Sequence, residues 1–169
     1  MSRLLGDTLP DDLVAALDGT ALVAKVGPAY LLVTSDEDGT PRPCMLSAGE
    51  LLAVDARKVR LALWRGSRTS ANLARGGHAL LCHVAPRTAV YVRGPARPLD
   101  AGPDLDLDCF ELEVDSVESD EHAGMPVTTG ITFGVERGDP AGVVEAWERQ
   151  LAGLRAATYR PMPRPAGPP

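Results

Sequence analysis

Hydroxyl and guanidinium side chains follow an apolar, strand-like segment in Leu61-Ala-Leu-Trp-Arg-Gly-Ser-Arg-Thr-Ser-Ala-Asn-Leu73. Ser67 is a favourable N-cap for a helix of about two turns, which glycines end. The first N–H groups of a helix have no partner within it, and Ser67, Arg68 and Thr69 place further donors beside them. The turn therefore predicts either a binding site for an anion such as phosphate or simply a capped helix with a solvated arginine.

Arg42 begins a neighbouring predicted strand and could supply a second guanidinium to such an anion. The sequence contains no G-x-G-x-x-G, G-x-x-x-x-G-K-[ST] or G-x-S-x-G motif, and its histidines show no metal-ligand spacing, so we expect no metal site. A Cys44–His83 pair stays open, with no sequence feature in its favour. If the protein is an enzyme, a bound cofactor is expected to carry the chemistry.

The elements that must position these side chains are mostly short strands. The chain has 169 residues, 44% apolar and 24% charged, which excludes a disordered chain and a disulfide scaffold. Apolar runs between turn residues predict strands over 29–34, 42–47, 50–54, 59–64, 79–84, 88–93 and 105–115, the last with a β-bulge. We expect a small barrel or sandwich in one domain, 1–159, followed by a flexible proline-rich tail, 160–169.

Two helices flank the predicted strands. The first runs from the candidate N-cap Thr8 to Gly19. The second is started by Asp139-Pro140, and its apolar stripe consists of Val143, Val144, Trp147, Leu151 and Leu154. These helices lie at the two ends of the chain, outside the predicted strands.

Charge is divided along the chain, although the net value is only −6. Residues 56–99 contain nine cations and no carboxylate, and residues 100–122 contain ten carboxylates and no Lys or Arg. Either the basic part binds an anion or the two parts pair as neighbouring strands. The net charge disfavours nucleic-acid and membrane partners, and the absence of a signal peptide or membrane-length apolar run favours a cytoplasmic protein. The three cysteines are interpreted as small buried hydrophobes.

Several segments in a fixed order resemble one known family. The turn and strand Gly39-Thr-Pro-Arg-Pro-Cys-Met-Leu46, the turn Ser67-Arg-Thr-x-x-Asn-Leu73 and the strand Val90-Tyr-Val-Arg-Gly94 resemble the pyridoxamine 5′-phosphate oxidase-like, FMN-binding split-barrel proteins. The resemblance covers about Leu22 to Val117. It implies a mainly β protein, a six-stranded antiparallel split β-barrel of Greek-key topology with a short internal helix and terminal helices. It also implies a homodimer with the flavin at the interface.

The resemblance also implies site residues. In that family an Arg at the start of the second strand and a Ser-Arg-Lys turn hold the flavin phosphate; Arg42, Ser67 and Arg68 match, and Thr69 replaces the lysine. The residues expected to line the flavin ring are Pro43, Cys44, Met45, Leu46, Ser47, Ala62 and Leu63. Ser47 stands where the oxidase has a lysine, and Thr88 and Ala89 replace its Arg-Gln pair, so oxidation of vitamin B6 is not implied.

The resulting expectation is an FMN-dependent oxidoreductase acting on an unidentified small molecule, with no side chain assigned as a catalytic residue. One alternative is a reductase of the same fold that uses the deazaflavin F420. Another is a flavin-binding or sensor module without turnover. The segment from Asp120 to Gly130 is long enough to cover a site, but no physical argument places it there.

Overall fold

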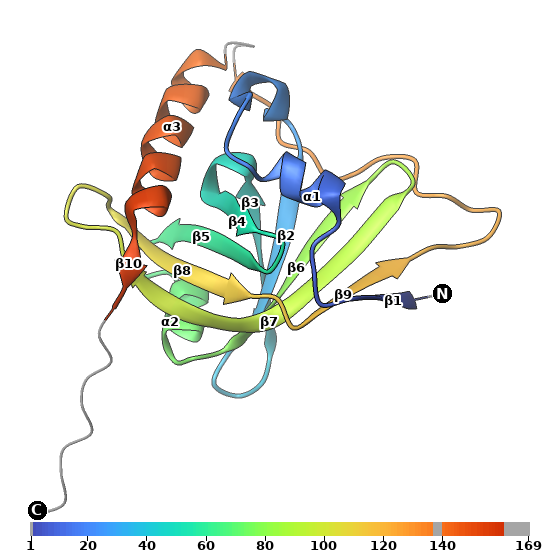
Figure 1. Cartoon of the computed structure of the whole chain (residues 1–169), viewed down its shortest axis with the longest axis horizontal. Coiled ribbons are helices and arrows are strands. Elements are labelled where there is room, and N and C mark those ends of the chain that lie inside the picture. Colours follow the sequence, from blue (N-terminus) through green and yellow to red (C-terminus); the bar gives the residue numbers. More distant parts are fainter. Residues whose placement is uncertain (1, 137–139, 161–169) are drawn as a thin grey trace, which may run out of the picture.

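The computed structural model describes residues 2–136 and 140–160 and shows a strongly bent antiparallel sheet with helices at its ends (Figure 1). Its strands are β1 (Ser2–Gly6), β2 (Ala29–Ser35), β3 (Pro41–Ser47), β4 (Leu51–Asp55), β5 (Lys58–Trp64), β6 (His78–Ala85), β7 (Thr88–Asp100), β8 (Leu107–Glu113), β9 (Ser116–Asp120) and β10 (Thr158–Tyr159). Its helices are α1 (Asp11–Ala16), α2 (Arg68–Ala74) and α3 (Ala141–Ala156), with short 3₁₀ turns η1 (Leu22–Lys25) and η2 (Ala48–Glu50). Among the described residues, no helix combines the length and apolar character that crossing a membrane requires.

The strands follow the order β3-β2-β6-β7-β8-β5-β4, and every pairing is antiparallel. The terminal strands of this path, β3 and β4, pair with β2 and β5 respectively and not with each other, so the barrel stays open along one seam. Three short strands lie off the path: β1 pairs with β9, and β9 and β10 pair with β7. The predicted antiparallel split barrel is therefore confirmed; its path has seven strands in place of the expected six, and short peripheral strands extend it.

The longest strand, β7, lets one sheet curve into a barrel. Its first part pairs with β6 as far as Pro95, and its last part pairs with β8 from Ala96 onward. Gly94 lies just before this change of partner, where a Cβ would be 1.7 Å from the carbonyl oxygen of Glu113. The chain between β8 and β9 therefore crosses directly over a position that has no room for a side chain.

Two of the predicted local features are wrong. The β-bulge predicted between 105 and 115 is absent, because β8 keeps an unbroken register with β5 from Leu107 to Glu113. Both faces of this strand are buried: Phe110 and Leu112 face the barrel interior, and Glu111 lies under the C-terminal end of α3. The first helix begins at Asp11 behind Pro10 with no side-chain cap and ends at Ala16, so Thr8 is not its cap and Gly19 lies beyond it.

The C-terminal helix follows its prediction closely. Helix α3 packs on η1, η2, β4 and β5 and buries Trp147, Leu151 and Leu154. Val143 and Val144 of the predicted stripe are partly buried against the same core. The predicted role of Asp139 and the predicted tail beyond Arg160 lie outside the described residues.

The division of charge reflects pairing between strands. The basic and acidic segments face each other in Arg60–Glu111 at 3.1 Å and Arg93–Glu118 at 2.7 Å. Arg65–Asp106 at 3.1 Å and Arg97–Glu113 at 3.5 Å add two more contacts. The interpretation that the two segments pair as neighbours is confirmed.

A histidine inside the barrel links stability to pH. The ring of His83 stacks on Tyr30 with centroids 5.3 Å apart, and its buried Nδ1 has no hydrogen-bond partner in the described structure. Burial lowers the pKa of His83 below its ordinary value of 6.5, although the charge of Asp12 opposes this shift. The folded protein therefore favours the neutral ring.

We expect the free energy of unfolding to fall as the pH drops below about 6.5, because the unfolded chain then binds a proton that folded His83 does not. The loss should level off once the pH is below the folded pKa. Chemical denaturation of the wild type and of His83→Phe, which keeps an aromatic ring on Tyr30, would measure it between about pH 7.5 and pH 5.5. Equal slopes in the two proteins would show that His83 does not cause the pH dependence.

Candidate functional site

The N-terminus of α2 is built as the sequence predicts. The Ser67 hydroxyl accepts the Ser70 N–H at 3.1 Å and so caps the helix. The carboxylate of Asp108 on β8 accepts the Ser70 hydroxyl and, at 3.3 Å, the N–H of Gly66. The N–H of Gly66 and both donors of Ser70 are thus already satisfied by the chain itself, and the side chains of Ser67 and Arg68 are among the groups left to contact an added anion.

The guanidinium of Arg42 is held by a carboxylate six residues earlier in the chain. Its Nε donates to both oxygens of Asp36, at 2.7 and 2.9 Å, and its Nη2 donates to Oδ2 at 2.5 Å. The amide of Asn72 on α2 donates to the same carboxylate at 2.9 Å and to the hydroxyl of Thr34 at 3.0 Å. The hydrogen bonds from Arg42 and Asn72 hold the pKa of Asp36 well below its usual range.

Thr69 and Cys44 face each other beneath this network. Thr69 is buried, and its hydroxyl acts to lower the pKa of the Cys44 thiol on β3. Burial outweighs this effect and raises the pKa of Cys44 above its ordinary value. Cys44 is therefore a neutral packing residue at physiological pH.

Strand β3 has one open edge, and its prolines show which residues face it. Pro41 and Pro43 have no N–H with which to bond β2. The odd-numbered residues of β3 therefore direct their backbone N–H and C=O groups away from β2, toward the open edge. Met45 and Ser47 share this parity, and the N–H of Ser47 indeed turns to the carboxylate of Glu50 at 2.7 Å. The backbone N–H and C=O of Met45 therefore lie on the open edge.

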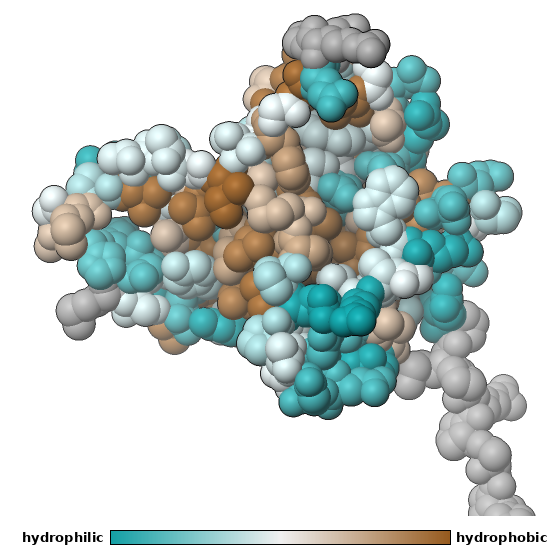
Figure 2. All heavy atoms as spheres, turned by 180° about the vertical axis from the view of Figure 1, so that it is seen from behind, coloured by the Kyte–Doolittle hydropathy of each residue, from teal (hydrophilic) through white to brown (hydrophobic). Residues whose placement is uncertain are grey.

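Side chains alternate across β3. Those of Arg42, Cys44 and Leu46 share the face toward the barrel interior and α2, with Leu46 fully buried, while Pro43 and Met45 lie on the outer face. Met45 is 37% exposed. The pairing of β3 with β2 and of β2 with β6 continues this outer face through Leu31 and Val33. Figure 2, the view from behind, shows apolar side chains gathered in a band across the molecule.

Ala62 and Leu63 lie on β5 at the other side of the seam. Both side chains are buried, so only their backbone could contact a ligand. The pairing of β4 with β5 stops at Leu61, and beyond that residue β5 pairs with β8 alone. The backbone edge of Leu63 and Trp64 thus borders the open seam, and the indole of Trp64 is 71% exposed.

The predicted site residues therefore fall into two groups. Arg42, Cys44, Arg68 and Thr69 lie where the start of β3 packs against α2, and Ser67 caps the N-terminus of that helix. Pro43, Met45 and Ser47 extend from there along the outer face of β3, with Leu46 inside the barrel and with Ala62 and Leu63 on β5 across the seam. The arrangement offers hydrogen-bonding backbone groups and an apolar surface, with cationic and hydroxyl side chains at one end.

One curated relative matches almost the whole chain. The protein YclD of Bacillus subtilis (strain 168), itself uncharacterized, is 33% identical over 149 residues, which are 87% of this chain and 96% of YclD. The chain belongs to the YclD family. No family model matches it.

Solved structures show that this YclD-family chain shares its fold with more distant proteins. A candidate pyridoxamine 5′-phosphate oxidase of Lactobacillus delbrueckii superposes with a TM-score of 0.54 and 19% identity, over 69% of this chain and 98% of that protein. HupZ of group A Streptococcus gives a TM-score of 0.51 and 10% identity over 75% and 99% of the two chains. The fold is thus the split barrel that these proteins share.

Sequence reasoning missed three polar residues of the candidate site. Asp36 is read only as turn chemistry, Asn72 only as a helix residue, and Asp108 only as part of an acidic run. The contact between Asp36 and Arg42 could have been predicted from the register of the β2–β3 hairpin. Because Thr34 pairs with Arg42, the turn that follows Thr34 lies beside that guanidinium. Nothing in the sequence indicates that Asp108 meets Ser70, because 38 residues separate them.

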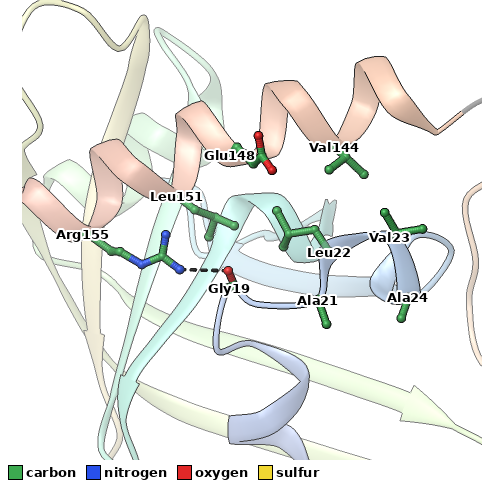
Figure 3. Close-up of a pocket in the computed structure, with 9 residues that line it drawn as sticks. All are labelled: Gly19, Ala21, Leu22, Val23, Ala24, Val144, Glu148, Leu151 and Arg155. Atoms are coloured by element: carbon green, nitrogen blue, oxygen red, sulfur yellow. Dashed lines mark hydrogen bonds between the residues drawn. The ribbon is translucent and has the colours of Figure 1, made fainter.

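Two other features lie apart from this site. A hollow between α3 and η1 is walled mainly by apolar side chains, and its Arg155 is used to hold the Gly19 carbonyl at 2.9 Å (Figure 3). The segment from Asp120 to Gly130 extends from β9 beside the β6–β7 turn, where the N–H of Arg87 donates to Val127 at 2.8 Å (Figure 1). It does not reach the start of β3.

Proposed function

We propose that this protein is a flavin-binding oxidoreductase that holds FMN along the outer side of β3 and acts on a small-molecule substrate. The observation that carries the proposal is the open edge of β3, where the backbone groups of Met45 point away from β2. The exposed side chains of Pro43 and Met45 lie on one face beside this edge, and α2 with Ser67 and Arg68 lies on the other. A flavin mononucleotide combines the matching parts, a flat apolar ring with a polar edge and a phosphate. The name of the Lactobacillus delbrueckii protein that shares the fold supports the same class.

Different residues would bind the ring and the phosphate of the cofactor. Pro43 and Met45 would pack against one face of the ring, and the outward backbone groups of Met45 would hydrogen-bond its polar edge. Ser67 and Arg68 would contact the phosphate, with Arg42 near by. A bound flavin supplies hydride and electron transfer, so the chain's own contribution is to bind the ring, orient it and exclude water.

A second copy of the chain is the proposed partner. The outer face of β2, β3 and β6 exposes apolar side chains, and β3 presents an unpaired edge along the described barrel. Ile131 and Phe133, 40% and 43% exposed, lie beside the start of β2, where backbone bonds join residue 131 to Ala29 and residue 133 to Gly27. A homodimer would bury this surface and enclose the flavin.

The first experiment is an absorbance spectrum of the purified protein, followed by titration with FMN monitored by flavin fluorescence. Flavin bands or saturable quenching at micromolar FMN, with a dimeric mass by light scattering, support the proposal. A protein that binds F420 but not FMN would be the deazaflavin reductase of the same fold. Flavin binding without reduction by NAD(P)H would indicate a module without turnover, and binding of neither cofactor would refute the proposal.

Arg68→Ala should weaken FMN binding about tenfold, because one charge-assisted hydrogen bond to the phosphate is lost. Arg68 is exposed and forms no ion pair within residues 2–136 and 140–160, so its removal should leave stability unchanged. Binding of riboflavin, which has no phosphate, should not change. Arg149→Ala, on the outer surface of α3, is the matched control. An FMN affinity equal to that of the wild type would place the phosphate elsewhere.

A further inference from the structure

We propose that Asp36 is a specificity-determining residue of the flavin site. Its carboxylate pairs with the Arg42 guanidinium and so suppresses recognition of a terminal phosphate. The site would then bind flavins chiefly through the ring and discriminate only weakly between FMN and riboflavin. This inference rests on the proposed function and departs from the expectation that Arg42 is a phosphate ligand.

The contact between Asp36 and Arg42 has the geometry that a phosphate would otherwise use. Arginine offers paired N–H groups as a planar fork, and Asp36 takes the Nε and Nη2 side of that fork with both of its oxygens. The two side chains are 21% and 31% exposed, so the pair is partly shielded from solvent. Asn72 holds the same carboxylate from the helix side. A phosphate that approached this side of the fork would have to displace a ligand that is fixed on two sides.

The surrounding charges also oppose an anion. The hollow between α2 and the β2–β3 turn is lined by the carboxylates of Asp36, Glu37 and Asp38 and by the guanidiniums of Arg68 and Arg75. Arg75 is itself paired with Glu37 at 3.3 Å. Repulsion between a phosphate and Asp36 offsets much of its attraction to Arg42, because the two charges are adjacent. Arg68 remains as the one lining cation outside an ion pair among the described residues.

The test compares FMN with riboflavin in three proteins, by fluorescence quenching and by thermal shift. The wild type should prefer FMN by about tenfold at most, the contribution of Arg68 alone. Asp36→Asn removes the charge but little volume and should raise FMN affinity about tenfold with riboflavin unchanged. Glu37→Gln removes one charge from the same turn without touching Arg42, so its effect on FMN should stay below about threefold.

Each outcome distinguishes the two proposals. If the wild type binds neither flavin, the proposed function fails. If both bind but FMN is preferred by more than about a hundredfold, the function stands and the role of Asp36 is refuted. Weaker FMN binding by Asp36→Asn would instead make Asp36 a residue that orients Arg42 toward the phosphate. An equal gain in Glu37→Gln would assign the effect to the general charge of the turn. The wild-type comparison needs no variant, so it remains decisive if a substitution disturbs folding.

Discussion

Arg60→Ala should lower the free energy of unfolding by about 3 kcal/mol or more, because it leaves a carboxylate buried without its main partner. Glu111 is 5% exposed, and Nε of Arg60 donates to it at 3.1 Å. Its other oxygen accepts the hydroxyl of Tyr159 at 2.5 Å, whereas Lys58 approaches only to 3.9 Å. A drop of this size corresponds to roughly 6–12 °C in Tm for a chain of this length.

Arg60, on β5, also caps the C-terminus of helix α3. Its Nη1 donates to the carbonyl oxygens of Leu154, Arg155 and Ala157, at 2.6, 3.3 and 3.1 Å. Carbonyls in the last turn of a helix have no partner within it, and a cation there is favoured by the helix dipole. Arg60 therefore fastens α3 to the outer face of β5 and β8, and its loss removes both the charge partner and the cap.

Thermal and chemical denaturation of three variants would separate these contributions. Arg149→Ala breaks an exposed i,i+4 pair with Glu145 on the same helix and should cost less than about 0.5 kcal/mol. Adding Glu111→Gln to Arg60→Ala should recover part of the loss, since it removes the uncompensated charge. No recovery in the double variant would mean that the helix cap, and not the buried charge, dominates.

The strands of the barrel could be predicted from the sequence because each has its own local signal. The turn that starts at Asp36 and includes Gly39 separates two apolar runs, and the structure pairs them in register from Ala29–Ser47 to Ser35–Pro41. Ser67 marks the start of α2 by its capping chemistry. The resemblance of these segments to one family then supplied the barrel topology, which periodicity alone left open between a barrel and a sandwich.

The failures have a common physical cause, which is that tertiary contacts override local pattern. Apolar side chains of β8 point to both faces of the strand because both faces are covered. From the sequence alone, the same pattern is interpreted as a β-bulge. Strand β1 is exposed or partly exposed along its length and carries no alternation that could predict it. In the site, the sequence indicates cations that can bind an anion, but only the fold shows that Asp36 already occupies Arg42.

Gly94→Ala is expected to destabilise the protein at least as strongly as Arg60→Ala, by about 3 kcal/mol or more. A Cβ at this position would lie 1.7 Å from the carbonyl oxygen of Glu113 and 2.8 Å from its carbonyl carbon. The obstacle is backbone, so no change of rotamer can relieve it. The crossing chain is also fixed beside Gly94, because the N–H of Asp115 donates to the carbonyl of Arg93 at 2.8 Å.

Relief of the clash would require β7 and the β8–β9 connection to separate, and on either side of that connection β7 pairs with β9 up to Arg93 and with β8 from Ala96 onward. The barrel should therefore loosen as a unit, and denaturation should show a lower midpoint and faster hydrogen exchange in β8 and β9. Gly142→Ala is the matched control, since its Cβ would meet nothing within 4 Å in the first turn of α3. It should leave stability unchanged or raise it by up to about 1 kcal/mol. Wild-type stability in Gly94→Ala would mean that the two chains can separate at little cost, and the curvature of β7 would then need another cause.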